Sequence, residues 1–325
     1  MSKCLGCGAE LQNNNINKIG YTTNIDKEYC LRCFRIKNYN DYRLVDKTND
    51  DFIPILEEIN KTDSLVILVV DLFNIGRIDN ISKYLNNKIL LVLTKKDILP
   101  ISYDKKVEEY FNDYKLNVID KVVISSKNNY NYDLLYSKIK KYKTKEIYVV
   151  GFTNAGKSSM INKLLYNYTD KNVNITTSYL PSTTLDTIEI ELDEYKLIDT
   201  PGILDEGNII NYVDKNTLKK IIPKNEIKPK IFQIKKEQSI IVDDILRIDI
   251  NPDNDIVFYM SNNLKYLRIY KDNDKLINLE KHIIDVDNNT DVVISGLGFI
   301  KIKKKSTIII YTLKNVLVYT RKSLI

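Results

Sequence analysis

The chain has 325 residues, of which 43% are hydrophobic, and its formal net charge at pH 7 is +6. This length suits two or three domains with ordinary cores, and no apolar run approaches the roughly 20 residues that a membrane-spanning helix requires. The single histidine argues against histidine-based catalysis, and the N-terminus lacks signal or transit peptide character, so we expect a cytoplasmic protein without membrane attachment.

The first part of the chain holds all four cysteines, arranged as two Cys-X-X-Cys pairs. Each pair can form a tight turn that presents two thiolates, and two such pairs are typical of a tetrahedral Zn²⁺ site. Disulfide bonds are the alternative, which the expected reducing compartment disfavours. Because four ligands leave no open coordination position, we predict a structural zinc site formed by Cys4, Cys7, Cys30 and Cys33.

After the cysteines, apolar strands alternate with helix-like segments. Such a repeat predicts a mainly parallel sheet whose ligand-binding loops lie at the carboxyl ends of its strands. The expected strands cover residues 64–71, 89–93, 121–124 and 147–150. The expected helices cover residues 52–59, 104–114, 132–142 and 159–166.

Two of these strands run directly into polar motifs, Thr94-Lys95-Lys96-Asp97 and Ser125-Ser126-Lys127. The carboxylate of Asp97 can accept hydrogen bonds from the ring N1–H and the exocyclic amine of guanine, and adenine offers neither donor there. Lys95 would lie along the base and sugar. A backbone amide of the second motif would donate to guanine O6, while Lys127 covers the other face of the base. Either motif alone is a common string, but both at strand ends predict a guanine site.

The segment Gly151-Phe152-Thr153-Asn154-Ala155-Gly156-Lys157-Ser158 follows the fourth strand and precedes a helix, which is the arrangement of a P-loop. Its amide groups, from Asn154 into the helix at Ser159, would face the phosphates of a nucleotide. Lys157 would reach the β and γ phosphates, and the Ser158 hydroxyl would bind Mg²⁺. A chance match is the alternative, but the chain has only 10 glycines and two of them fall in register here.

Two later segments complete the predicted phosphate site. In Asp199-Thr200-Pro201-Gly202, the Asp199 carboxylate can hold Mg²⁺ and the Gly202 amide can meet the γ phosphate. In Pro181-Ser182-Thr183-Thr184-Leu185-Asp186, Thr184 is the candidate for the second hydroxyl ligand of Mg²⁺, and Thr183 is its rival. A plain surface turn is the alternative for this segment. The predicted catalytic residues are Lys157, Thr184 and Gly202.

The order of these motifs differs from that of ordinary GTPases, which place the P-loop ahead of the guanine-reading motifs. With the cysteine pairs and the segments 291–299 and 318–325, this order makes the chain resemble the YqeH family of circularly permuted, ribosome-assembly GTPases of bacteria. The resemblance implies GTP hydrolysis coupled to maturation of the small ribosomal subunit, with GTP or GDP, Mg²⁺ and Zn²⁺ bound. It also implies the small subunit and its rRNA as partners, and we expect a monomer.

The resemblance further implies slow intrinsic hydrolysis, because Ile203 follows Gly202 where many GTPases have a water-orienting glutamine. Related GTPases without this glutamine use K⁺, and Asn154 matches the asparagine that helps to hold the ion. Thr94 and Ser182 depart from the family pattern, which often has asparagine and glycine at these places. Two alternatives stay open: an RNA-binding assembly scaffold with negligible GTP turnover, and an ATP-using enzyme, against which Asp97 argues.

We expect three parts: a zinc-binding module at residues 1–45, the permuted α/β GTPase domain at 46–212, and a basic connector with a small β-rich domain at 213–325. In the last part we predict a helix at 274–284 and strands at 239–250, 255–260, 265–270, 291–302, 307–312 and 316–320. A basic turn there could bind RNA, or its lysines could protect an edge strand; its members are Lys301, Lys303, Lys304 and Lys305. Because the chain from Ile203 onward leaves for this part, we hypothesise that the γ phosphate orders residues 203–212 and repositions the C-terminal domain.

Overall fold

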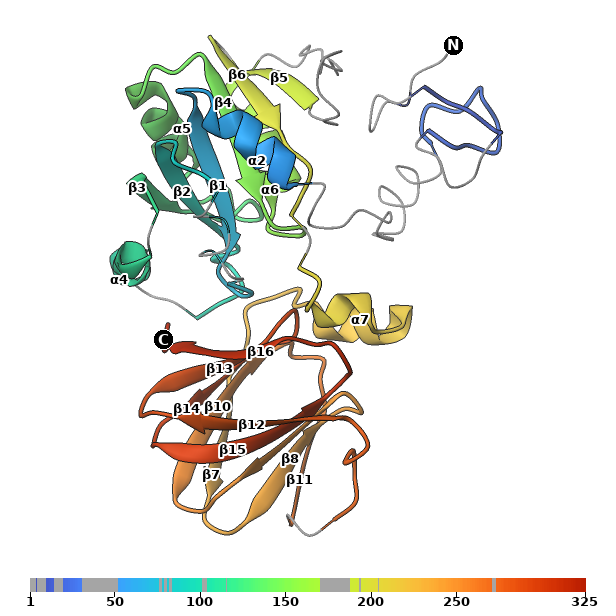
Figure 1. The fold of residues 1–325 in the computed structure, drawn as a ribbon, viewed down its shortest axis with the longest axis vertical. Helices are drawn as coiled ribbons and strands as arrows, with labels where there is room; N and C mark the ends of the chain where they lie inside the picture. The colour runs from blue at the N-terminus through green and yellow to red at the C-terminus, as the bar shows by residue number, and fades with distance from the viewer. Residues whose placement is uncertain are drawn as a thin grey trace.

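The structure is a computed structural model that describes residues 4, 10–14, 20–30, 52–75, 78, 81, 84–100, 104–114, 116–169, 188–192, 194–203, 205–270 and 273–325. Figure 1 shows an α/β part above and a part built of two β-sheets below, with α7 (Lys215–Ile221) near their junction. Cys7, Cys33 and the segment 181–186, which carry predicted site residues, lie outside the described residues. Within the described part of the chain, no helix has the length and apolar character needed to cross a lipid bilayer.

A six-stranded sheet forms the centre of the α/β part, in the order β3-β2-β1-β4-β6-β5. Neighbouring strands run parallel except β5, which is antiparallel to β6. The predicted mainly parallel sheet is therefore confirmed. The strands are β1 (Leu65–Asp71), β2 (Ile89–Thr94), β3 (Val118–Val123), β4 (Glu146–Gly151), β5 (Ile188–Leu192) and β6 (Tyr195–Asp199).

Helices cover both faces of this sheet, which explains why β1 is apolar throughout. Val66 and Leu68 contribute to a core shared with α2 and α4. Leu65 and Ile67 contribute to a second core shared with α5 and α6. A strand with both faces covered needs no polar alternation. The helices are α2 (Ile53–Asn60), α4 (Asp104–Tyr110) with the 3₁₀ turn η2 (Phe111–Asp113), α5 (Tyr132–Lys141) and α6 (Lys157–Tyr168).

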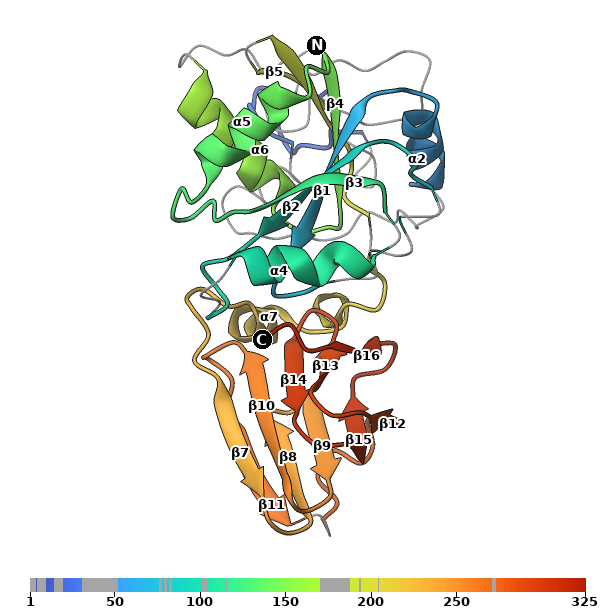
Figure 2. The ribbon, with the colours of Figure 1, turned by 90° about the vertical axis from the view of Figure 1, so that its left-hand side faces the viewer.

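Two five-stranded antiparallel sheets form the second part, in the orders β16-β13-β14-β10-β7 and β11-β8-β9-β15-β12. They share an apolar core dominated by isoleucine, and Figure 2 shows most of their strands running lengthwise away from the α/β part. A short 3₁₀ turn, η3 (Ile209–Asn211), and α7 precede them. The strands are β7 (Lys230–Ile234), β8 (Gln238–Val242), β9 (Leu246–Ile250), β10 (Asn254–Met260), β11 (Tyr266–Tyr270), β12 (Glu280–Val286), β13 (Thr290–Ile294), β14 (Gly298–Ile302), β15 (Ser306–Thr312) and β16 (Val318–Lys322).

The β-rich character of this part is confirmed, but several predicted elements differ. The predicted strands 239–250 and 291–302 each form two strands, and Asp243, with φ 43°, lies in the first of the turns that divide them. The predicted helix 274–284 is wrong, because residues 280–286 form β12, which pairs antiparallel with β15. Pairing with a distant strand outweighs the local helical pattern here. The predicted basic connector, whose lysines run from Lys215 to Lys236, also contains α7 and β7.

The loop after β1 packs against the sheet that contains β13, β14 and β10. Phe73 belongs to a core that also holds Tyr259 and Phe299, whose stacked rings have centroids 4.7 Å apart. The hydroxyl of Tyr319 donates a hydrogen bond to the carbonyl of Ile75. One apolar core therefore extends from the α/β part into the β-sheets.

The turn between β13 and β14 is held by side chains from two segments of the α/β part. Gly296 N donates to Asn74 Oδ1 at 3.0 Å. On its other side, a Cβ placed on Gly296 would lie 1.8 Å from Asn208 Oδ1, and the φ of Gly296 is +81°. Asn208 is 5% exposed, and its Oδ1 accepts a hydrogen bond from Ile210 N at 3.1 Å. The turn therefore requires glycine.

We expect Gly296→Ala to lower the free energy of unfolding by about 2–3 kcal/mol. A left-handed backbone costs a residue with a Cβ about 1–2 kcal/mol, and displacing Asn208 removes a cap worth about 1 kcal/mol. Urea unfolding followed by circular dichroism measures the loss. In an Asn208→Ala background the same substitution should cost only the backbone contribution, so strictly additive effects would contradict this explanation.

Candidate functional site

The P-loop lies at the carboxyl end of β4, where the chain turns into α6. β1 and β4 are neighbours at the centre of the sheet. On the side of β1 the sheet continues to β2 and β3, and on the side of β4 it continues to β6. Parallel sheets bind ligands at such a switch point, beyond the ends of the strands. Asn154, in the middle of the loop, is exposed and has φ 63°, a local conformation of the kind that aims successive amides at one anion.

Lys157 is the first residue of α6, and its ammonium group is buried at the base of the P-loop. Its Nζ donates to Gly151 O at 3.0 Å, and the residue is 8% exposed. Burial lowers the pKa of Lys157, although the nearby Asp199 acts in the opposite direction. A phosphate entering the loop would give this ammonium a stronger partner than a neutral carbonyl.

Asp199 ends β6 beside the P-loop strand, opposite Val149 of β4. Its Oδ1 is buried and has no hydrogen-bond partner among the described residues. Burial raises the pKa of this carboxyl to about 6, and the attraction of Lys157 offsets the shift only in part. A buried carboxylate oxygen without a donor suits a cation, and the exposed Ser158 supplies a second oxygen. This donor set fits Mg²⁺, which takes oxygen ligands and keeps several waters.

Gly202 lies directly against the buried ammonium group. A Cβ at this position would lie 3.0 Å from Lys157 Nζ and 3.0 Å from Thr153 Cα. The structure thus brings three predicted site residues together, namely Lys157, Asp199 and Gly202. Thr184 and its rival Thr183 lie outside the described residues, so the second threonine ligand stays a prediction.

The predicted zinc ligands are only half described. Cys4 and Cys30 are both buried, and Cys30 N donates to Cys4 Sγ at 3.1 Å. Cys7 and Cys33 fall outside the described residues. No group of three or more histidine, cysteine, aspartate or glutamate side chains is placed to hold a metal in the part of the chain that the structure describes. The zinc site stays a prediction.

The predicted guanine-reading motifs follow β2 and β3, and polar side chains connect them to each other and to the P-loop. Ser125 Oγ donates to Asp97 Oδ1 at 2.6 Å, so the two motifs meet at the predicted base acceptor. Thr94 Oγ1 lies 2.6 Å from Ala155 O, which connects the first motif to the P-loop. Thr94, at the place where asparagine is commoner, therefore contacts the phosphate side of the site.

Asp71, at the end of β1, was missed by sequence analysis. Its Oδ2 accepts from Lys95 Nζ at 2.5 Å, and its Oδ1 accepts from Phe73 N at 2.8 Å. The carboxylate thus orients the lysine that is expected along the base, and it also begins the loop that packs on the β-sheets. A charged residue that directly follows an unbroken apolar strand was the signal that could have found it.

A cavity of about 400 Å³ lies beside Asp97. Both guanine-reading loops and the predicted connector contribute to its lining, through Lys96, Asp97, Leu99, Pro100, Ser125, Asn128, Tyr130 and Glu226. No P-loop residue is among these, so the cavity adjoins the base end of the site and not the phosphate end. Lys127 extends toward the connector, where its Nζ donates to Lys224 O at 2.8 Å. No motif of the sequence indicates that the connector reaches the guanine-reading loops.

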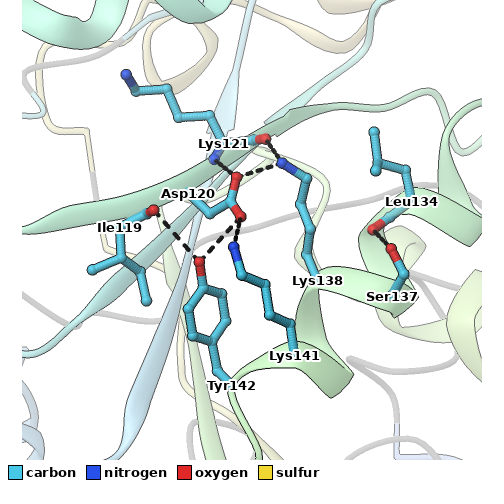
Figure 3. Close-up of polar contacts among 8 residues, drawn as sticks. All are labelled: Ile119, Asp120, Lys121, Leu134, Ser137, Lys138, Lys141 and Tyr142. Carbon is cyan, nitrogen blue, oxygen red and sulfur yellow. Dashed lines mark hydrogen bonds and ion pairs between the residues drawn. The ribbon is translucent and has the colours of Figure 1, made fainter.

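Polar contacts between β3 and α5 fix the flanks of the second guanine-reading loop (Figure 3). Asp120 Oδ1 pairs with Lys138, and Asp120 Oδ2 lies 3.3 Å from Lys141 Nζ and 3.1 Å from Tyr142 OH. Burial alone would raise the pKa of Asp120, but hydrogen bonds from Lys138 and its neighbours hold the pKa below its usual value. The loop that carries Ser125 to Lys127 thus leaves a strand and enters a helix that are joined to each other.

We expect Asp120→Asn to destabilise the fold by about 1–2 kcal/mol at pH 7, because it weakens charge-assisted hydrogen bonds that are largely shielded from water. Since folding lowers the pKa of Asp120, its contribution is complete above the unfolded value of about 4 and is lost as the pH falls through the folded value. Urea unfolding at pH 7 and near pH 3 should show the difference shrinking. Ser137→Ala is the matched control, since among the described residues Ser137 Oγ donates to Leu134 O of its own helix. An equal loss there would contradict the assignment.

The segment after Gly202 is bound to the P-loop at its start. Ile203 N donates to Gly151 O at 3.0 Å, and Thr153 N donates to Ile203 O at 2.9 Å. Both backbone groups of Ile203 are therefore engaged, and its apolar side chain cannot orient water. Movement of Gly202 would be transmitted directly to these hydrogen bonds.

The same segment is bound to the C-terminal β-sheets farther along. Leu317 N donates to Gly207 O at 2.8 Å, and Ile209 N donates to Ser295 O at 2.9 Å. The Ser295 hydroxyl also donates to the carboxylate of Asp205. The segment therefore has one end in the nucleotide site and the other on the turns beside β13 and β16.

Two protein-family profiles match the chain. One, described as "50S ribosome-binding GTPase", matches residues 146–294, and the other, described as "RsgA GTPase", matches residues 61–207. Together they extend over the P-loop, both guanine-reading motifs and part of the C-terminal β-sheets.

Curated proteins and one solved structure are also similar. The chain is 35% identical to the uncharacterised protein YqeH of Bacillus subtilis over an alignment of 363 positions, which covers 99% of each chain. It is 27% identical to NO-associated protein 1 of Arabidopsis thaliana, covering 72% of this chain and 49% of the relative. It is 28% identical to the tRNA modification GTPase MnmE of Borreliella burgdorferi, covering 80% of this chain and 52% of the relative. The crystal structure of YjeQ from Thermotoga maritima matches with a TM-score of 0.29 and 22% identity, over 44% of this chain and 49% of that chain.

Proposed function

The chain belongs to the YqeH-type circularly permuted GTPases, and from this premise we propose that it is a GTP-hydrolysing switch that assists assembly of the small ribosomal subunit. Hydrolysis of GTP is the activity that the family and its GTPase domains carry. The choice of the small subunit, the K⁺ dependence and the assignment of individual residues are parts of the proposal.

One observation supports this proposal most: the segment from Ile203 to Ile209 joins the nucleotide site to the C-terminal β-sheets by backbone hydrogen bonds at both ends. A γ phosphate is present before hydrolysis and absent after it, so contacts at Gly202 differ between the two states. Because Gly202 directly precedes this segment, we propose that the difference is passed on to Ser295 and Leu317 through these hydrogen bonds. This is the arrangement that a nucleotide-controlled binding surface requires.

In the proposed mechanism, the chain binds and positions the triphosphate while water attacks. Lys157 donates to the β and γ phosphates, and the Gly202 amide donates to the γ phosphate. Ser158 and Asp199 would hold Mg²⁺, with Thr184 as the third proposed protein ligand. When bound, Mg²⁺ neutralises part of the charge on the transferred phosphoryl group. Because Lys157 is buried at the base of the P-loop, its attraction for the phosphates is stronger than it would be in water.

Ile203 stands at the position of the water-orienting glutamine and has no polar side chain. The chain itself therefore supplies little stabilisation there for the charge that develops during hydrolysis. We propose that K⁺, held with the help of Asn154, contributes positive charge there. Asn154 is exposed at the mouth of the P-loop, where such an ion would have to lie. GTP hydrolysis should then be several times faster in K⁺ than in Na⁺ at equal ionic strength.

The proposed rRNA-binding surface lies on the connector more than on the predicted basic turn. In that turn Lys301 contacts Ile325 O, Lys303 pairs with Asp255 at 3.2 Å, and Lys305 pairs with Asp287 at 3.4 Å. These contacts offset part of the positive charge of the turn. The edge-protection alternative is wrong, because β14 and β15, which the turn joins, each have a neighbouring strand on both sides. The lysines of the connector region are all exposed, namely Lys215, Lys219, Lys220, Lys224, Lys228, Lys230, Lys235 and Lys236. Their charge suits the phosphate backbone of RNA.

Sedimentation with separated ribosomal subunits tests the function. The protein should pellet with the small subunit when a non-hydrolysable GTP analogue is bound, and much less with GDP. Binding to the large subunit alone, or binding that ignores the nucleotide, would contradict the proposal. An RNA-binding scaffold with negligible turnover is the second candidate, which Ile203 favours. It is distinguished by a GTP hydrolysis rate that stays at background in K⁺ even with small subunits present.

A further inference from the structure

The connector segment from Lys224 to Lys228 lies against both guanine-reading loops. Lys127 Nζ donates to Lys224 O at 2.8 Å and to Asn225 Oδ1 at 3.3 Å. Ile227 N donates to Ile98 O, directly after Asp97, at 2.8 Å. The side chain of Ile227 is 1% exposed and belongs to the core of the α/β part. Three contacts of different kinds therefore hold the connector at the base end of the nucleotide site.

The other side of the connector is held by the C-terminal β-sheets through one side chain. Asn262, in the turn between β10 and β11, donates from Nδ2 to Glu226 O at 2.8 Å. Its Oδ1 accepts from Lys228 N at 2.8 Å. The amide of Asn262 thus fixes the backbone on both sides of Ile227.

We propose that the connector completes the guanine site, with Lys224 and Asn225 as positioning residues for Lys127 and Asn262 as the residue that fixes the connector. The inference rests on the proposed guanine-reading role of Asp97 and Lys127. With its ammonium held by Lys224 O, the aliphatic stem of Lys127 is restrained beside the loop that meets the base.

The energetic reason is preorganisation. A free lysine side chain has about 2 kcal/mol of rotamer entropy, part of which is lost when the stem packs on a base. The contacts with the connector restrict the side chain before the nucleotide arrives, so less is lost on binding. Because coupling is reciprocal, a bound guanine nucleotide also stabilises the connector against the β-sheets. The base, and not only the γ phosphate, is then linked to the C-terminal part.

Titration of the full-length protein with fluorescent GDP tests this proposal. Asn262→Ala should weaken GDP binding about fivefold, equivalent to about 1 kcal/mol, because both of its hydrogen bonds to the connector are lost and Lys127 is then less restrained. Asn263→Ala is the matched control, because Asn263 is an exposed neighbour whose hydrogen bond within the described part of the chain is made by its backbone N–H, to Ser261 Oγ at 3.4 Å. An affinity of Asn262→Ala within twofold of that control would overturn the proposal.

A double-mutant cycle separates positioning from a general structural effect. Lys127→Met keeps the aliphatic stem and removes the ammonium, so Asn262→Ala should have little further effect on GDP binding in that background. Additive losses would overturn the proposal. If Asn262→Ala lowers the thermal midpoint below that of the control, Asn225→Ala takes its place in the cycle, because it removes only a side-chain contact with Lys127.

The same titration with Asp97→Asn keeps this inference distinct from the proposed function. If Asp97→Asn shifts toward xanthine nucleotides and Asn262→Ala leaves the GDP affinity unchanged, only the role of the connector is refuted. An unchanged base preference in Asp97→Asn refutes the guanine assignment itself, and with it the premise of the inference.

Discussion

Asp97→Asn is expected to lower the affinity for GDP about a hundredfold and to make the protein prefer xanthine nucleotides. A carboxylate accepts from both N1–H and the exocyclic amine of guanine, whereas the asparagine amide offers one acceptor and one donor. Xanthine has a carbonyl in place of the amine and so matches that amide. Hydrogen bonds to charged groups contribute about 1.5–3 kcal/mol each, and losing about 3 kcal/mol corresponds to the hundredfold change.

Competition of GDP and xanthosine diphosphate for the site measures this change. The structure adds that Asp97 Oδ1 accepts from Ser125 Oγ at 2.6 Å, a contact that an asparagine oxygen can still accept, so the loops should keep their arrangement. Asp63→Asn is the control, since Asp63 is exposed and precedes β1 at the opposite edge of the sheet. Retained preference for GDP in Asp97→Asn would refute the base assignment.

The second large effect is expected from Asp199→Asn, which should act in opposite directions on stability and on catalysis. Folding raises the pKa of this carboxyl from 3.8 to about 6, mainly through burial. Near pH 7.5 the charged form therefore costs the nucleotide-free protein about 3 kcal/mol, since one pKa unit corresponds to about 1.4 kcal/mol. Asparagine removes this cost, so the thermal midpoint without nucleotide should rise. Hydrolysis of GTP with Mg²⁺ should fall about a hundredfold or more, because a metal ligand is lost.

Thermal unfolding over a range of pH checks the sign of the stability effect. The difference between variant and wild type should be largest above pH 6 and should vanish below about pH 4, where the wild-type carboxyl is protonated in both states. Wild-type protein in a chelator provides the comparison for catalysis, and the two should be similarly slow. A less stable nucleotide-free variant with normal Mg²⁺-dependent hydrolysis would contradict the role given to Asp199.

The α/β fold and the residues at its strand ends were predictable because their signals are local. A glycine-containing loop between an apolar strand and a helix specifies where Lys157 lies, and the strands before Thr94 and Ser125 specify where those motifs emerge. Parallel strands then bring all of these loops to one edge of the sheet. The structure confirms the sheet, and it places Ser125 in contact with Asp97 and Thr94 in contact with the P-loop.

The remaining features depend on contacts between distant segments, which periodicity does not reveal. Residues 280–286 form a strand because β15 is available to pair with them, although their own pattern suggested a helix. Asp71 and Asn262 act through hydrogen bonds to residues far away in the sequence, and no short sequence motif contains both partners. The fixed position of Gly296 likewise follows from the side chain of Asn208, which arrives from another part of the chain.

The central claim is that the segment after Gly202 transmits the nucleotide state to the C-terminal β-sheets. Hydrogen exchange compared between GDP and a non-hydrolysable GTP analogue tests it most directly. We predict slower exchange with the analogue in residues 203–212, and in the amides of Ser295 and Leu317 that hydrogen-bond with or beside this segment. Unchanged protection from residue 203 to residue 325 would contradict the claim.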